Sequence, residues 1–280
     1  MMNMHLMGIP VVGVGSQPEE DENLNYLEMP TGMATFRQAI LPEQDDLADY
    51  PHVHTLLQQA QNLLDAGAGH LDLNATAVAE RRLLNQILSD GEVSVLFDTR
   101  NGGHIEVQET SLPGVWWHRT LDANQTCVDE TLEVGTIPQL VQQTTFANAA
   151  ANFALPDVNT LPAGTINAPG LLAELHAAVS QQQFGHVINL SLLPLSPEDL
   201  AFITACLGVG KTAILSRGYG NCRITATAIQ NVWWVQYFNS TDTLILNTLE
   251  VVDVPLVACA SAEDLADSRE RLQEIREALL

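Results

Sequence analysis

The segment GVGKT at 208–212 is the part of the sequence that most resembles a chemical motif, the phosphate-binding loop. The full motif needs glycine at position 205, where this chain has Ala205. It also places the loop between a strand and a helix, so that amides of the helix face the phosphates. Here a helical run precedes the loop and a strand follows it. Lys211 is therefore predicted to lie in a turn that ends a helix, with no role in nucleotide binding.

The four cysteines and eight histidines are the other residues that could ligate a metal or carry out catalysis. No two cysteines lie within ten residues of each other, so the Cys-x-x-Cys spacing of zinc sites is missing. We interpret the cysteines as small core residues, while a site that joins Cys206 or Cys222 to a histidine stays open. The histidines accompany no recognisable catalytic motif. We therefore predict no catalytic residue, no cofactor site and no metal site.

Two tryptophan pairs, at 116–117 and 233–234, each lie in a predicted strand. Consecutive residues of a strand point to opposite faces of the sheet, so the strand that contains Trp233, Trp234 and Tyr237 is apolar on both faces. Burial of these side chains against another part of the chain is the favoured interpretation. The alternative is a partner-binding patch that includes Trp233 and Tyr237.

A glycine-rich segment, SRGYGNCRITATAIQ at 216–230, leads into an alternating strand and contains two of the few basic residues. A hairpin with a glycine bulge is the favoured interpretation. The alternative is a site for a carboxylate or a peptide backbone, with Arg217 and Tyr219 as candidate binding residues.

The chain contains two copies of one unit. Trp116 and Trp117 recur as Trp233 and Trp234, 117 residues later, and the string TLEV at 131–134 recurs at 248–251. Two copies at so long a period indicate a duplicated domain and not a solenoid. We expect two equivalent units related by a pseudo-twofold axis.

Each unit is predicted to contain a helix, a strand, a second helix and three consecutive strands. The leading helices lie near 53–65 and 169–182, the short strands at 70–74 and 187–191, and the second helices at 76–89 and 197–207. Strands that follow one another in sequence pair antiparallel, so the fold is predicted as α+β with helices on one face of mostly antiparallel sheets. The predicted segments are an acidic extension at 1–48, a first repeat at 49–141, a linker at 142–166, a second repeat at 167–258 and a C-terminal helix at 259–280.

The charge balance limits the possible partners. Acidic residues outnumber basic residues 34 to 11, which gives a net charge of −23. Such a surface repels nucleic acid and anionic lipid and attracts a basic partner. The acidic run Glu19, Glu20, Asp21 and Glu22 is either a solubilising tail or a binding segment for such a partner. No apolar run is long enough to insert in a membrane and no secretory signal is recognisable, so a cytoplasmic protein is expected.

Several segments resemble one known family. GYGNCRITATAIQNVWWVQYFN, TLILNTLEVVDVP and ACASAEDLADSRERL are similar to the C-terminal part of the HupH/HyaF hydrogenase accessory proteins, called HoxQ in some operons. GVGSQPEE and YLEMP near the N-terminus also resemble this family. The resemblance implies a cytoplasmic factor in the maturation of uptake nickel–iron hydrogenases. Its implied partners are the precursor of the iron–sulfur small subunit, before twin-arginine export, and a thioredoxin-like companion protein.

Two classes of function remain open at this point. The favoured one is a binding protein or assembly chaperone without enzymatic activity, whose acidic surface could capture the basic start of a twin-arginine signal. The alternative is an enzyme or carrier that handles iron or an iron–sulfur cluster directly. The lack of clustered metal ligands in the sequence favours the first class.

Overall fold

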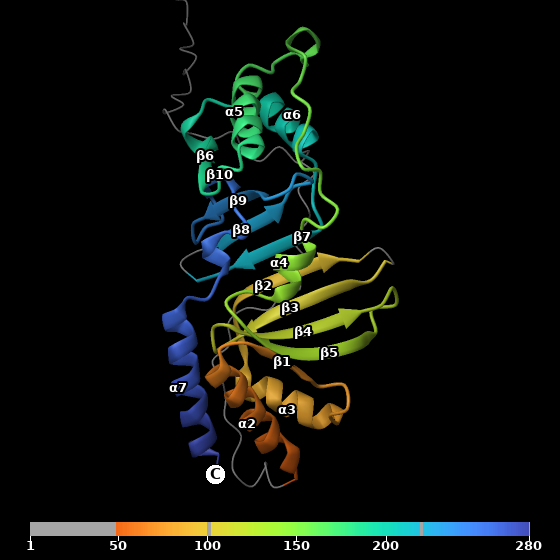
Figure 1. Cartoon of the computed structure of the whole chain (residues 1–280), viewed down its shortest axis with the longest axis vertical. Helices are drawn as coiled ribbons and strands as arrows, with labels where there is room; N and C mark the ends of the chain where they lie inside the picture. Colours follow the sequence, from red (N-terminus) through yellow and green to blue (C-terminus); the bar gives the residue numbers. More distant parts are fainter. Residues whose placement is uncertain (1–48, 100–101, 219–220, 280) are drawn as a thin grey trace, which may run out of the picture.

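The computed structural model describes residues 49–99, 102–218 and 221–279. Its strands form one ten-stranded sheet in the order β1-β5-β4-β3-β2-β7-β8-β9-β10-β6, and all neighbouring strands are antiparallel. Helices α2 and α3 lie at one end of the long axis, helices α5 and α6 at the other, and the sheet runs between them (Figure 1). The predicted α+β class is confirmed.

The helices and strands occur in the same order in the two halves of the chain. The first half contains α2 (Pro51–Ala66), β1 (Gly69–Asp72), α3 (Val78–Leu88), β2 (Asp90–Asp98), β3 (His104–Thr110), β4 (Val115–Leu121) and β5 (Cys127–Val134). The connection contains α4 (Gln139–Thr144) and η1 (Val158–Thr160). The second half contains α5 (Ala168–Ser180), β6 (His186–Asn189), η2 (Leu190–Leu192), α6 (Pro197–Leu207), β7 (Thr212–Ser216), β8 (Asn221–Ala226), β9 (Val232–Phe238) and β10 (Leu244–Val251). The chain continues with η3 (Leu256–Ala258) and α7 (Ala262–Ala278).

Each half has four strands after its second helix, one more than predicted. In the first half, β3 is the most polar of the four and carries a histidine, two glutamates and a glutamine. Its polar composition hides the strand pattern, yet β3 pairs with β2 on one side and β4 on the other. A central strand can be this polar because its side chains meet partners on the neighbouring strands.

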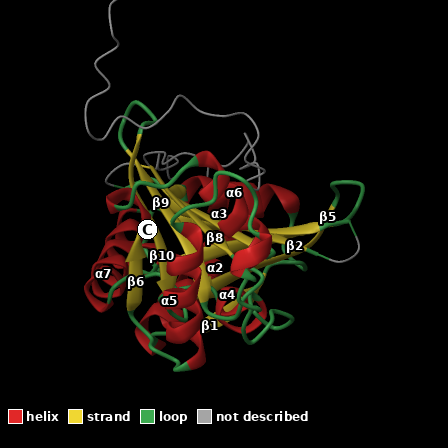
Figure 2. Cartoon of the chain, turned by 90° about the horizontal axis from the view of Figure 1, so that it is seen from above, coloured by secondary structure: helices red, strands yellow, loops and turns green. Residues whose placement is uncertain are grey.

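The two halves meet in the middle of the sheet, where β2 pairs with β7. The pairing is centred on Val95 and Ile214 and is reciprocal about them: Val93 lies opposite Ser216, and Phe97 lies opposite Thr212. This is the register that the expected pseudo-twofold axis between the halves would give. Seen from above, the strands cross one another at changing angles, so the sheet is strongly twisted (Figure 2).

Equivalent side chains of the two halves form equivalent hydrogen bonds. The indole Nε1 of Trp117 donates to a carboxylate oxygen of Glu130 at 2.7 Å. The indole Nε1 of Trp234 donates to the amide oxygen of Asn247 at 2.5 Å, and both members of this pair lie 117 residues after those of the first. The repeat in the sequence therefore corresponds to a repeat of local structure. We use the word counterpart for residues related in this way.

Polar caps fix the starts of two helices. The Ser196 side chain accepts a hydrogen bond from the backbone of Asp199, whose own side chain accepts one from the backbone of Ser196. Ser261 and Asp264 form the same reciprocal pair at the start of α7. These capping boxes satisfy backbone N–H groups that have no partner inside the helix. The bounds of α6 are those predicted.

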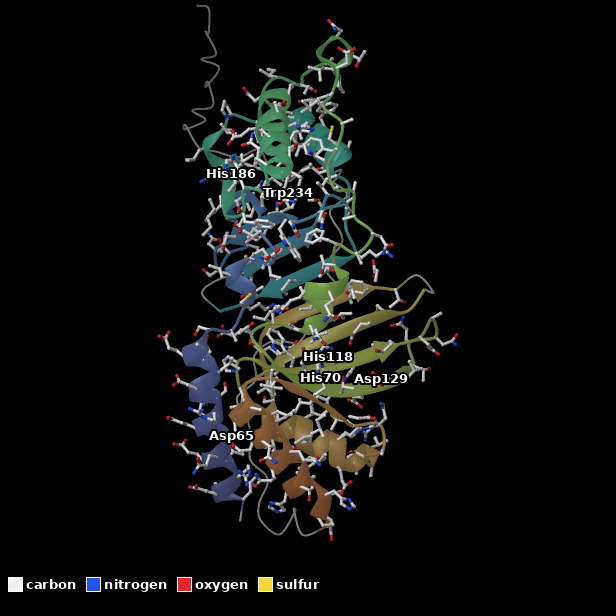
Figure 3. All side chains as sticks on the ribbon, viewed as in Figure 1. Asp65, His70, His118, Asp129, His186 and Trp234 are labelled. Carbon is white, nitrogen blue, oxygen red and sulfur yellow. The ribbon has the colours of Figure 1, made fainter. Side chains whose placement is uncertain are left out.

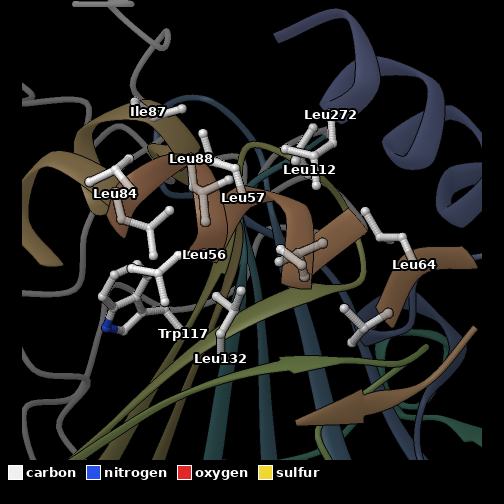
Figure 4. Packing of buried hydrophobic residues seen from close by; sticks show 14 of the residues in the cluster. Leu56, Leu57, Leu64, Leu84, Ile87, Leu88, Leu112, Trp117, Leu132 and Leu272 are labelled. Atoms are coloured by element: carbon white, nitrogen blue, oxygen red, sulfur yellow. The ribbon is translucent and has the colours of Figure 1, made fainter. Parts of the chain in front are cut away.

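Buried apolar side chains form three clusters. One lies between the sheet and the helices of the first half and includes Leu57, Leu84, Trp117 and Leu132, with Leu272 of α7 (Figure 4). A second lies between the sheet and α5 and α6 and includes Trp234. The third lies on the opposite face of the sheet at the junction of the halves. Burial of this apolar surface is the main stabilising contribution to the fold.

The last helix, α7, packs on the first half and not on the repeat that precedes it. Its residue Leu272 is fully buried in the first cluster. Gln61 of α2 donates its side-chain amide to the carbonyl of Arg269 at 3.2 Å. The Ser268 hydroxyl donates to the carbonyl of Pro113 at 2.8 Å. Helix α7, at the end of the described chain, thus packs against α2, at its beginning.

Candidate functional site

The predicted partner-binding residues do not all lie in the described part of the chain. The acidic extension at 1–48, with Glu19, Glu20, Asp21 and Glu22, lies outside it, and so does Tyr219. The remaining predicted residues are Arg217, Trp233 and Tyr237. The structure separates them by burial and by the contacts that each one makes.

Trp233 offers no exposed surface to a partner, which agrees with the favoured interpretation and rules this residue out of the alternative partner-binding patch. Its side chain is fully buried in the third cluster, which also contains its counterpart Trp116. The ring of Phe146 contacts it edge-on at 5.1 Å, and its indole Nε1 donates to the carbonyl of Asp253 at 3.1 Å. The predicted linker at 142–166 supplies Phe146, so this segment covers the sheet face that the sequence left open. Burial was the favoured interpretation, and it holds for this residue.

Tyr237 is half-buried and lies beside Cys222 on the neighbouring strand. Burial raises the pKa of the Cys222 thiol to about 12, and it also raises the pKa of the Tyr237 hydroxyl to about 12. Both groups are neutral near pH 7, and a thiol that stays protonated is a weak nucleophile and a weak metal ligand. This pair is therefore suited to packing and hydrogen bonding.

Arg217 and Lys211 flank β7. The backbone N–H of Arg217 donates to the carbonyl of Glu92 at 3.0 Å, which continues the pairing of β7 with β2. Lys211 precedes β7 and follows Gly208, the residue that caps the C-terminus of α6. The predicted turn from helix to strand at Lys211 is confirmed, and Arg217 belongs to the junction of the two halves.

A partly buried acid–base cluster on β1, β4 and β5, with His70 half-exposed, was not predicted. The His118 Nε2 atom lies 2.8 Å from one carboxylate oxygen of Glu133, and the His70 Nε2 atom lies 3.5 Å from the other (Figure 3 labels both histidines). Burial alone would raise the pKa of Glu133, but His118, the backbone N–H of Gln139 and His70 outweigh it, so the pKa is lowered. The cluster can hold a proton between a carboxylate and an imidazole. In the second half, valines at 235 and 187 replace both histidines.

A second charged cluster lies on the helix-facing side of the same strands. Glu130 accepts from Trp117, and its two carboxylate oxygens also lie 3.2 Å from Arg81 Nε and 3.3 Å from Arg119 Nε. This geometry neutralises a largely buried carboxylate. At the counterparts of Arg119 and Glu130 the second half has Gln236 and Asn247, and the helix position equivalent to Arg81, aligned from the starts of α3 and α6, is Leu200. The second half thus lacks this charged cluster.

Glu109, at the end of β3, is a third buried carboxylate. It is 4% exposed, and its Oε1 atom accepts from the backbone N–H of Gly114 at 3.0 Å. Burial raises its pKa to about 7; the hydrogen bond from Gly114 opposes this shift and the charge of Glu92 adds to it. Its counterpart in the second half is Ala226. A glutamate that aligns with an alanine was the signal in the sequence that could have identified this position.

The thiols share one electrostatic property. The pKa is raised at each cysteine by burial: Cys127, Cys206, Cys222 and Cys259. Within residues 49–99, 102–218 and 221–279, no group of three or more His, Cys, Asp or Glu side chains is arranged to hold a metal ion. Among the helices of the described chain, none is both long and apolar enough to cross a membrane.

Comparison with known proteins gives a consistent result. The family described as HupH hydrogenase expression protein, C-terminal conserved region, matches residues 51–154 and 165–279. Hydrogenase expression/formation protein HupQ of Azotobacter chroococcum mcd 1 is 45% identical over 96% of this chain and 96% of its own length. Hydrogenase expression/formation protein HoxQ of Cupriavidus necator is 41% identical over 97% of this chain and 98% of its own length. Hydrogenase-1 operon protein HyaF of Escherichia coli is 31% identical over 95% of this chain and 94% of its own length.

A solved structure, the hydrogenase expression protein HupH from Thiobacillus denitrificans, is 32% identical to the part of this chain that it matches. The match covers 41% of this chain and 97% of that one, with a TM-score of 0.37. The family match spans both halves of the chain, and the relatives match along nearly its whole length. The chain therefore belongs to the HupH family of hydrogenase expression/formation proteins.

Proposed function

We propose that the chain is an accessory protein in the maturation of an uptake nickel–iron hydrogenase, and that it acts by binding and not by catalysis. Its client is the precursor of the iron–sulfur small subunit, which it holds in the cytoplasm before export, together with a thioredoxin-like companion. The observation that carries the proposal is the match, over nearly the whole chain, to proteins named for hydrogenase expression and formation.

The chemistry of the described residues supports a binding role. A carrier of iron or of an iron–sulfur cluster would hold its cargo through thiolates, and burial disfavours thiolate formation at Cys206, Cys222 and Cys259, whereas Cys127 is exposed. The net charge of −23 favours a basic client at long range. We therefore propose the binding role ahead of the carrier role.

Metal analysis separates these two roles. The chain is purified without oxygen from cells that make the hydrogenase, and its iron content is measured. The proposal expects iron well below one atom per chain in the fraction that is free of the client. Stoichiometric iron in that fraction, lost when Cys206 or Cys222 is replaced by serine, would support the carrier role instead.

The charge argument has its own test. Charges separated by more than about 8 Å are largely screened at physiological salt, so association with the unprocessed small subunit should slow as salt rises. Replacing Glu19, Glu20, Asp21 and Glu22 by Gln, Gln, Asn and Gln should slow it further at low salt if this run contacts the client. An association rate that is unchanged at every salt concentration would assign the run to solubility.

A further inference from the structure

The two ends of the sheet differ in chemistry although they occupy equivalent places. The sheet ends with β1 in the first half and with β6 in the second. Among the described residues, β6 pairs only with β10, so its other edge can pair with an added strand. Proteins usually protect such an edge with charged side chains or proline, because a free edge binds other strands.

Large apolar side chains are exposed at the β6 edge. Val187 in the middle of β6 is 50% exposed, and Phe184 just before the strand is 54% exposed. Leu192, at the end of η2, is 79% exposed, and Ile245 on β10 is 61% exposed. The Ser191 hydroxyl accepts from the backbone N–H of Asn247, so η2 continues along β10 beyond the end of β6. We call Phe184, Val187, Leu192 and Ile245 the edge strip. Its members lie on both faces of the sheet, because Val187 is opposite Glu250 whereas Ile245 is at the bulge beside Phe238, and an added strand points alternate side chains to the two faces.

The β1 edge does not carry this strip. The counterparts of Phe184, Val187 and Leu192 are Gly67, His70 and Ala75, and only Ile245 has an apolar counterpart of similar exposure, Val128 at 60%. Large exposed apolar side chains on one edge alone are not required by the fold, because the other edge folds in the same way without them. They therefore point to binding.

The helices α5 and α6 and the strands β6, β9 and β10 together carry acidic residues and no lysine or arginine. Arg223 of β8, however, lies over the ring of Phe238, which pairs with Leu244 beside Ile245. Glu174, 56% exposed at its side chain, lies 3.0 Å from His186 of β6, and Glu250 of β10 is the strand neighbour of Val187. A partner with basic residues beside its apolar side chains would meet complementary charge here.

We propose that the free edge of β6 docks an extended segment of the client, which adds an eleventh strand to the sheet. The segment places apolar side chains on the edge strip and carries lysine or arginine at its ends, close to Glu174 and Glu250. Main-chain hydrogen bonds supply affinity, and the strip and the acids supply selectivity. The identity of the client rests on the proposed function, whereas the chemistry of the segment rests on the edge itself.

The test uses the full chain and three synthetic peptides with a common apolar core of about six residues. One peptide ends in lysines, one ends in glutamates, and one ends in lysines but carries N-methyl groups on alternate backbone nitrogens. Binding is measured by fluorescence anisotropy with the wild type, with Ile245→Lys and Val187→Lys, and with Val128→Lys. The last is the matched control, because it places the same charge at the counterpart of Ile245 with nearly the same exposure.

The proposal expects the lysine-ended peptide to bind the wild type at least about tenfold more tightly than the other two. It expects Ile245→Lys and Val187→Lys to weaken this binding about tenfold or more, and Val128→Lys to leave it within about twofold. Equal binding of the lysine-ended and glutamate-ended peptides, equal effects of Ile245→Lys and Val128→Lys, or no binding to the wild type would each overturn the proposal. A wild type that dimerises through β6, and becomes monomeric in Val187→Lys without binding the peptide, would assign the edge to a second copy and would also overturn it.

The same variants separate this inference from the proposed function. If Ile245→Lys loses the peptide but still binds the unprocessed small subunit as the wild type does, the client does not dock on this edge and the proposed function stands. If the wild type binds the lysine-ended peptide but never binds the small subunit, the edge site stands and the choice of client is wrong. Thermal unfolding of each variant shows whether a loss of binding reflects a loss of fold.

Discussion

Replacing Glu109 by glutamine should stabilise the protein near neutral pH and flatten the dependence of its stability on pH. Glutamine keeps an oxygen that can accept the hydrogen bond from the Gly114 backbone N–H, so the change removes the ionisable proton and little else. In the folded protein burial raises the pKa of Glu109 to about 7, from 4.5 in a solvated chain. The unfolded state therefore releases this proton at a lower pH than the folded state does.

The sign and the size follow from that difference. Below about pH 4.5 Glu109 is protonated in both states and does not make stability depend on pH. Between pH 4.5 and 7 only the unfolded state is ionised, so the free energy of unfolding falls as pH rises. Each pKa unit corresponds to about 1.4 kcal/mol, so the loss reaches about 3 kcal/mol above pH 7. The Glu109→Gln variant escapes this loss.

Urea unfolding of wild type and variant between pH 4.5 and 8 measures the effect. The difference in free energy of unfolding should grow by about 3 kcal/mol over this range and then stay constant. Glu106→Gln is the matched control, because it makes the same substitution on the same strand at a side chain that is 50% exposed. Parallel curves for wild type and Glu109→Gln would refute the reasoning.

Three further changes test the repeat, a capping residue and the loop at 208–212. Trp117→Ala and Trp234→Ala should each lower the free energy of unfolding by about 3–5 kcal/mol. Both indoles are buried, and both indole N–H groups donate to the equivalent strand position. A large effect at only one of the two sites would contradict the equivalence. Asp199→Asn should cost about 2 kcal/mol in urea unfolding at pH 7, since the Asp199 carboxylate accepts backbone N–H groups of Ile166, Asn167, Ala168 and Ser196. Burial opposes ionisation of Asp199, but these hydrogen bonds outweigh it and lower the pKa of the carboxyl. The loss of stability in Asp199→Asn should therefore shrink as pH falls through the acidic range. A loss that is constant down to pH 2 would contradict this. Equilibrium dialysis should find no ATP or GTP bound to the wild type; binding that is lost in Lys211→Ala would show that the turn is a nucleotide site.

Local features of the fold could be predicted because their signals are local. The capping boxes at Ser196 and Ser261 mark the starts of α6 and α7. In the last helix, Leu265, Leu272 and Ile275 recur at helical spacing, which predicts that this helix packs on a core. The duplication could be read from the recurrence of the tryptophan pair and of TLEV. These patterns depend on residues a few positions apart or on direct self-similarity, both of which a sequence displays.

The long-range pairings could not be predicted. Nothing in the periodicity of β2 or β7 says that the two halves join there into one sheet, because any free edge with a suitable pattern can pair. The packing of α7 on the first half could not be predicted from the sequence either. Its apolar stripe fits either half, and the contacts of Ser268 and Leu272 choose the first.

The buried charges were missed for a related reason. The sequence showed only that the histidines accompany no catalytic motif, whereas His118 lies against Glu133 on the adjacent strand. That contact depends on the register of β4 against β5, which places Trp116 opposite Glu133 and His118 two residues away. Register is set by the whole sheet, so a residue-by-residue comparison of the two copies shows where they differ but not which differences meet in space.

The most direct test of the proposed function is co-purification from a cell that expresses the hydrogenase. The chain carries an affinity tag, the bound proteins are identified by mass spectrometry, and a strain without the small-subunit gene is the control. The proposal predicts the unprocessed small subunit among the bound proteins, with the thioredoxin-like companion, and its absence from the control. Recovery of the large subunit alone, or of no hydrogenase component when the precursor accumulates in the same cell, would contradict it.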